Sequence, residues 1–204
     1  HEQLAGRLRG LISLAEGMPC VVVASIGSAM KKTVPSCTFR EHAISVRTGK
    51  EGDVEEIKRK LVLMGYERAA SVESVGQFAM RGGILDIYPP NTDQPIRIEF
   101  FGEEVDSIRS FDPISQRSVS GMDEIAVYPA QEIVRTGDSF SVAAEKIGTL
   151  GAQRMKKLSP EQRERLSARL GRIVEALESG TNLQMLEQSI HYLYEKPAML
   201  WDHL

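Results

Sequence analysis

The chain has 204 residues, enough for one or two modest domains with hydrophobic cores of their own. Charged residues make up 26% of it and the net charge is −3, which excludes a general attraction to nucleic acid or to an anionic membrane surface. Cys20 and Cys37 are too few and too far apart for a metal knuckle or a disulfide framework, so reduced thiols are expected. No apolar run approaches the roughly 20 residues that span a bilayer, and no signal peptide is visible.

The first 38 residues are expected to be part of a larger α/β domain. Residues 2–16 carry apolar side chains at helical spacing, and Gly17 follows as a stop signal. The predicted stripe consists of Leu4, Leu8, Leu11, Ile12 and Ala15. The apolar run at 21–24 is typical of a strand buried on both faces of a parallel sheet. Because only one such strand is present and His1 lies inside the helical pattern, we expect a fragment of a longer protein.

Residues 39–133 are expected to form a compact α+β module. A strand is predicted at 43–46, followed by a helix that begins at the capping box of Asp53 and Glu56 and ends at Gly65. The pair Gly82-Gly83 separates two alternating runs, a pattern that predicts a two-residue hairpin. In that register the apolar side chains share one face. Met80 lies opposite Leu85 and Phe78 opposite Ile87, while Arg81, Ile84, Asp86 and Tyr88 occupy the other face.

The next strand, at 96–101, alternates in the same way, with Ile96, Ile98 and Phe100 inward and Arg97, Glu99 and Phe101 outward. An exposed aromatic beside exposed arginines on rigid strands indicates a docking surface, because these residue types are the usual interface anchors. Two alternatives stay open from the pattern alone. Arg97 and Glu99 can form ordinary cross-strand ion pairs, and Phe101 can be covered by the following turn or by a helix.

The last seventy residues are predicted to be helical. Ser159, Pro160 and Gln162 form a strong start signal for a helix whose apolar stripe includes Leu166, Leu170, Ile173, Val174 and Leu177, with Gly180 as its end. A further helix is predicted to carry Leu183, Leu186, Ile190 and Leu193. Seven Lys or Arg residues lie between 154 and 172, against Glu161 and Glu164. This run is an alternative site for direct binding of DNA phosphates, or simply a solvated helix face.

The sequence carries no motif for catalysis, cofactor or metal binding. It has no G-x-x-x-x-G-K-[ST] phosphate loop, no H-E-x-x-H and no paired C-x-x-C, and its four histidines lack metal-ligand spacing. An enzyme is therefore not expected in this chain.

Four segments resemble the second domain of the bacterial transcription-repair coupling factors (Mfd), a module shared with the excision-repair protein UvrB. They are LMGY at 63–66, GQFAMRGGILDIYP at 76–89, RIEFFG at 97–102 and SIRSFD at 107–112. The segment FDPISQRS at 111–118 has the form found in the coupling factors. The resemblance implies an α+β (α/β) fold in three parts. These are the incomplete tail of a helicase-like first domain (1–38), an antiparallel-sheet UvrB-like domain (39–133) and a helical return segment (134–204).

The resemblance also implies a function. The UvrB-like domain of this family binds UvrA, the damage-recognition ATPase, and its contact positions correspond here to Arg81, Arg97 and Phe101, with Glu99 in support. It implies a cytoplasmic bacterial parent protein that binds RNA polymerase and double-stranded DNA and translocates with ATP and Mg²⁺ in motor domains of helicase superfamily 2. This chain is then expected to be a non-enzymatic adaptor that links stalled polymerase to nucleotide excision repair, with no cofactor of its own.

Overall fold

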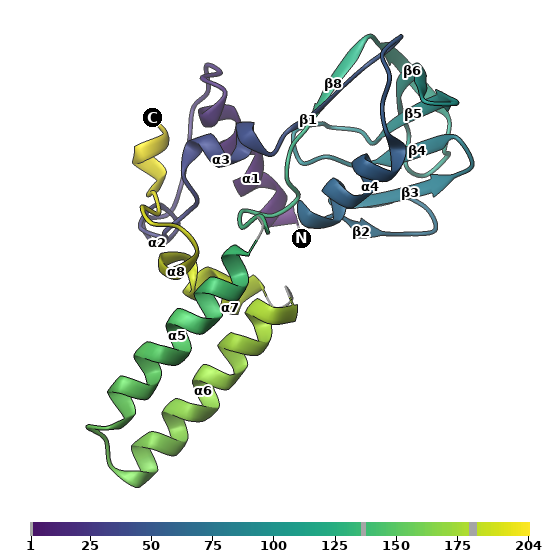
Figure 1. The fold of residues 1–204 in the computed structure, drawn as a ribbon. Coiled ribbons are helices and arrows are strands. Elements are labelled where there is room, and N and C mark those ends of the chain that lie inside the picture. The colour runs from purple at the N-terminus through teal and green to yellow at the C-terminus, as the bar shows by residue number, and fades with distance from the viewer. Residues whose placement is uncertain (1, 136–137, 180–182) are drawn as a thin grey trace. The chain divides into compact units, whose positions relative to one another are not determined.

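The computed structural model describes residues 2–135, 138–179 and 183–204 and divides the chain into two compact units. The first unit consists of residues 1–24, 36–134 and 203–204, and the second of residues 25–35 and 135–202. The first combines helices with mostly antiparallel sheet, and the second is largely helical, so the fold class is α+β (Figure 1). Among the described residues, no helix combines the length and the apolar character needed to cross a membrane.

The first unit holds every strand among the described residues. Its elements in chain order are α1 (Glu2–Ala15), α3 (Ser36–Glu41), β1 (Ile44–Arg47), α4 (Val54–Leu63), β2 (Glu67–Arg68), β3 (Gln77–Arg81), β4 (Ile84–Ile87), β5 (Ile96–Phe101), β6 (Glu104–Phe111), β7 (Ser118–Met122) and β8 (Glu124–Val127). Strands β2 to β7 form one sheet in sequence order, in which only β2 and β3 are parallel. Strands β1 and β8 form a separate antiparallel pair.

The predicted hairpin and its register are confirmed. Met80 pairs with Leu85 and Phe78 with Ile87 across the β3–β4 turn, where Gly82 takes a positive φ of 59°. Gly83 is required for a different reason, since a Cβ there would lie 2.7 Å from the backbone oxygen of Phe100 on β5. The two glycines thus serve the turn and the close approach of the neighbouring strand.

One face of the large sheet packs against α4 to form the main core. The helix begins at Asp53, whose side chain accepts hydrogen bonds from the backbone N–H groups of Glu55 and Glu56. Ile57, Leu61 and Met64, which recur at helical spacing, are buried against the inward side chains of β3 to β6. The inward residues of this cluster on those strands are Phe78, Leu85, Ile87, Ile96, Ile98, Val105 and Ile108.

The buried strand predicted at 21–24 is wrong. The segment forms neither helix nor strand, and Val21 and Val23 are each 93% exposed. A strand needs a neighbour that takes its backbone hydrogen bonds, and every strand in the described part of the chain pairs elsewhere. The preceding helix α1 does form, and its Leu8, Leu11, Ile12 and Ala15 are buried as predicted; the side chain of Leu4 lies outside the described residues.

The second unit contains α2 (Ile26–Ala29), α5 (Ser139–Met155), α6 (Pro160–Ser179), α7 (Leu183–Gln188) and α8 (Ile190–Leu193), and η1 (Leu200–His203) follows. The predicted capping box of α6 is confirmed, because Ser159 N–H donates to Gln162 Oε1 and Gln162 N–H to Ser159 Oγ. Helices α5 and α6 form an antiparallel pair (Figure 1). The end predicted at Gly180 lies outside the described residues, and the one further helix predicted beyond it is two short helices, α7 and α8.

Candidate protein-binding surface

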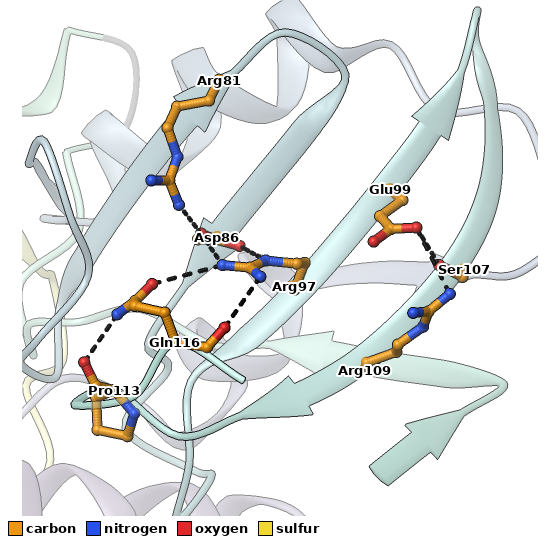
Figure 2. Close-up of polar contacts among 8 residues, drawn as sticks. All are labelled: Arg81, Asp86, Arg97, Glu99, Ser107, Arg109, Pro113 and Gln116. Atoms are coloured by element: carbon orange, nitrogen blue, oxygen red, sulfur yellow. Dashed lines mark hydrogen bonds and ion pairs between the residues drawn. The ribbon is translucent and has the colours of Figure 1, made fainter. Parts of the chain in front are cut away.

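The face of the sheet opposite α4 is built around one buried carboxylate, that of Asp86. Strand register places Asp86 on β4 directly beside Arg97 on β5 and Ala79 on β3. The Asp86 side chain is only 1% exposed. It accepts bonds of 2.7 and 2.8 Å from Nε and Nη2 of Arg97, and a third of 2.8 Å from Nη2 of Arg81 (Figure 2). A bidentate arginine is the partner that a buried carboxylate needs.

This arrangement corrects the predicted face, which was expected to present its side chains to solvent. Ala79 is buried with Val72 and Phe111 in a second, smaller apolar cluster with Tyr88 packed against it, and Asp86 on the same face is buried as well. Alternation assigned the face but gave no sign that the chain before β3 and the end of β6 fold over part of it. The face is therefore an exposed patch beside a covered one.

Arg97 lies at the border of the two patches, and its side chain is 16% exposed. Its guanidinium stacks over the Phe111 ring at 4.6 Å from the centroid and donates weakly to the backbone oxygen of Gln116 at 3.4 Å. The hydrogen bond to Asp86 raises the pKa of Arg97 above its usual value, against the opposing effect of burial, and the charge of Glu99 adds to the rise. Arg97 is thus held charged and in one orientation.

The loop between β6 and β7 brings Gln116 to Arg97. Asp112 begins this loop by accepting a 2.7 Å hydrogen bond from the Ser115 backbone N–H, which lowers the pKa of the Asp112 carboxyl. Gln116 takes a positive φ of 59°, donates to the carbonyl of Pro113 and places its own side-chain oxygen 3.5 Å from Arg97 Nη2. Neither Asp86 nor Gln116 was singled out from the sequence, although Asp112-Pro113 is a recognisable turn signal.

Glu99 was expected to support Arg97 on the outward face of β5. The direct contacts of Arg97 with a carboxylate are made with Asp86. Glu99 instead accepts a 3.0 Å hydrogen bond from the Ser107 hydroxyl and pairs with Arg109 at 3.6 Å, both on β6 (Figure 2). Its support of Arg97 is electrostatic and acts at longer range. Cross-strand ion pairs, the open alternative for this face, are therefore present, with partners that the sequence did not identify.

Phe101 is the exposed aromatic residue of the surface. It ends β5 next to a bulge between Glu99 and Phe100, and 84% of it is accessible to solvent. Phe100 packs against the main core, as alternation predicts. Gly102, with φ of 65°, opens the turn into β6 and leaves the Phe101 ring uncovered within this unit. Arg81 is also open, with 53% of its side chain exposed.

The basic run at 154–172 belongs to the second unit, where it spans the end of α5, the connecting turn and most of α6. All its Lys and Arg residues are exposed. Two of them make contacts within the unit, since Arg163 donates to the carbonyl of Leu158 and Arg169 to the side chain of Gln188. The run is an exposed, mostly helical surface of the second unit, whereas Arg81 and Arg97 lie on the sheet of the first unit.

Comparison with known proteins identifies the sheet-containing region. Residues 44–133 match the family model of the UvrB interaction domain. The chain is 36% identical over 203 residues to the transcription-repair-coupling factor of Bacillus subtilis, covering 99% of this chain and 17% of that protein. It is 32% identical over 200 residues to the corresponding factor of Staphylococcus haemolyticus, covering 98% of this chain and 17% of that protein. The factor of Myxococcus xanthus is 38% identical over 164 residues, covering 79% of this chain and 14% of that protein.

These matches agree with the resemblance found in the sequence motifs, and they extend it to both ends of the chain. The chain spans 17% of the length of the first two relatives. Residues 44–133 therefore match the UvrB interaction domain family, within a chain that is similar along nearly its whole length to transcription-repair-coupling factors.

Proposed function

We propose that this chain is the UvrA-recruiting adaptor region of a transcription-repair coupling factor, and that Arg81, Arg97 and Phe101 bind UvrA. The observation that carries the proposal is the exposed ring of Phe101 beside two arginines organised on a buried carboxylate. Aromatic and arginine side chains of this kind are the residues that most often dominate binding energy at interfaces. The face lies inside the region that matches the UvrB interaction domain.

The chemistry of each residue suggests a separate part in binding. Phe101 offers apolar surface without any loss of core packing, because its ring is already outside the core. Arg81 makes a single hydrogen bond to Asp86, so its remaining N–H groups can donate to carboxylates of UvrA. Arg97 is more enclosed, so only an edge of its guanidinium is accessible to a partner, while Nε and Nη2 are held by Asp86. Glu99 supports the group through its negative charge.

The proposal extends to the whole protein from which such a region comes. The parent is a cytoplasmic bacterial protein that binds stalled RNA polymerase and double-stranded DNA. Its motor domains use ATP and Mg²⁺ for translocation, while this region acts without catalysis or cofactor. By holding UvrA close to the stalled polymerase, the adaptor links transcription to nucleotide excision repair.

A titration of the purified chain against UvrA tests the proposal. Phe101→Ala and Arg81→Ala are expected to weaken the complex by about 1–3 kcal/mol each, with an unchanged thermal melt. The matched controls are Val62→Ala and Arg59→Ala on α4, which are exposed residues of the same unit on the helix that covers the other sheet face. Absence of wild-type binding from a folded sample, or equal losses in the controls, would contradict the proposal. Arg97→Ala is a less clean test because it also removes the bidentate partner of Asp86.

A second candidate function is direct binding of duplex DNA by the basic run at 154–172. Every Lys and Arg side chain of the run is exposed, and α6, which carries most of the run, begins at the Ser159 cap. Both observations support this function. Since phosphate contacts release counterions, this function predicts DNA binding that falls steeply as salt rises, without UvrA. DNA binding that is insensitive to charge reversal at Arg165 and Arg172 would contradict it.

A further inference from the structure

The β5–β6 ladder places two arginines directly opposite each other. Arg97 on β5 and Arg109 on β6 are register partners on the same sheet face. Like charges in this position destabilise a sheet unless other groups neutralise them. The structure contains one carboxylate for each arginine, and the two carboxylates hold their arginines very differently.

Arg97 is held tightly inside the domain, and Arg109 is held only loosely. Asp86 holds Arg97 through two short hydrogen bonds, and Phe111 lies under its guanidinium. Arg109 has one ion pair with Glu99 at 3.6 Å, and the same Glu99 oxygen also accepts the Ser107 hydroxyl (Figure 2). The Arg109 side chain is 44% exposed. Its N–H groups are therefore only partly used within the chain.

The arginines of the face are unequally neutralised. Asp86 holds Arg97 through two short hydrogen bonds and Arg81 through one, whereas Glu99 holds Arg109 by a single contact of 3.6 Å, and Glu104 lies exposed opposite Phe101. The two arginines with the most exposed side chains, Arg81 and Arg109, therefore have the fewest contacts with carboxylates. A face of this kind favours a partner with negative charge and steers its approach.

Sheet order sets the spacing of these two groups. Arg81 is on β3 and Arg109 on β6, with β4 and β5 between them. At roughly 4.8 Å per strand and with an offset of two residues along the strands, their backbones are about 16 Å apart. Their guanidiniums contact different carboxylates, Asp86 on β4 and Glu99 on β5, so one acidic side chain is not expected to meet both. The partner is then expected to present at least two acidic side chains.

We propose that Arg109 is a further partner-contacting residue of this face and that it donates to a second acidic group of the partner. The inference rests on the proposed function, because it assigns Arg109 to the same surface and the same partner, UvrA. The site then crosses four strands, with Arg81 and Arg109 at its two sides and Arg97 held between them by Asp86.

The test is a titration of the full chain with UvrA at two salt concentrations. Arg109→Ala is expected to weaken binding roughly tenfold and to reduce the salt dependence of binding. Arg109→Glu is expected to weaken binding further, because the reversed charge repels the acidic group of the partner. Arg109→Lys keeps the charge without the planar fork and should recover part of the loss. Arg59→Ala on α4 is the matched control, with the same loss of charge at an exposed position of the same unit.

The outcomes separate this inference from the function on which it rests. Loss of affinity in Arg109→Ala and Arg109→Glu, with partial recovery in Arg109→Lys, supports the role of Arg109. Affinities equal to that of Arg59→Ala, in a protein whose wild type binds and whose Phe101→Ala variant does not, overturn the role of Arg109 and leave the adaptor function standing. Absence of wild-type binding overturns both. A lower thermal melt in all Arg109 variants, with equal binding loss in Ala, Lys and Glu, makes the residue structural and also overturns the inference.

Discussion

Asp86 and Arg97 lie opposite each other in the β4–β5 ladder and are joined by two hydrogen bonds of 2.7 and 2.8 Å. The carboxylate is buried and the guanidinium is close to it, so neither charge has water as its main partner. The pair connects the two patches of the face, the covered one around Phe111 and the exposed one around Arg81. We expect the pair to contribute both to the stability of the sheet and to the geometry of the proposed binding surface.

Asp86→Ala is expected to lower the free energy of unfolding by about 3 kcal/mol or more, because it leaves two arginines without their shared buried partner. Urea denaturation of the chain measures the change. Asp106→Ala removes an exposed carboxylate from β6 and serves as the control, with an expected change of less than about 0.5 kcal/mol. Equal stabilities of the two variants would show that Asp86 has no such role.

The tyrosines of the first unit predict how stability changes at alkaline pH. Burial raises the pKa of Tyr66 well above its usual value, and burial together with a hydrogen bond to Glu16 raises the pKa of Tyr128 to about 12. Between pH 10 and about 12, the unfolded chain loses phenolic protons that the folded chain keeps. The stability contribution is therefore complete below pH 10 and is lost as the pH rises toward 12.

Tyr66→Phe tests this alkaline effect. The variant loses the 2.6 Å hydrogen bond from the Tyr66 hydroxyl to the carbonyl of Tyr128, which costs about 1 kcal/mol at neutral pH. Its stability should nevertheless fall less steeply than that of the wild type between pH 10 and 12, since one titrating group is gone. Urea denaturation at several pH values measures both effects. A variant whose stability falls as steeply as that of the wild type over this range would contradict the prediction.

Gly83→Ala is expected to destabilise the sheet by about 1–3 kcal/mol. The added methyl group would lie 2.7 Å from the Phe100 carbonyl oxygen, and neither backbone strand can move without breaking the ladder next to Phe101. Thermal denaturation measures the loss. Gly121→Ala on β7 is the control, because a Cβ there meets nothing within 4 Å. A similar melting temperature for both variants would contradict the prediction.

The sequence predicts the local elements of this chain better than it predicts which distant segments pack around a given residue. The hairpin register, the Asp53 cap and the Ser159 capping box follow from spacing and turn chemistry, and the structure contains each of them. The exposure of Phe101 follows from alternation along β5. These features depend on residues that are close together in the chain, so the sequence pattern alone is enough to predict them.

Features that depend on distant segments were not predictable in the same way. Asp86 is buried on a face where Ala79 packs with Val72 and Phe111, and the guanidinium of Arg97 contacts both Phe111 and the loop that carries Gln116. The strand expected at 21–24 failed for the same reason, because a strand is defined by a partner that the run itself does not encode. For the candidate site, the sequence predicts Arg81, Arg97 and Phe101 but gives no sign of the part of Asp86, the residue that organises the arginines.

The exposed valines at 21 and 23 have a practical consequence for experiments on this chain. A β-branched run with an unpaired backbone is a template for edge-to-edge association between molecules, so concentrated samples are expected to self-associate through it. Lysine at both positions would place like charges on such an edge and oppose association without touching the sheet in which Arg81, Arg97 and Phe101 lie. The doubly substituted chain is the suitable background for every titration described above.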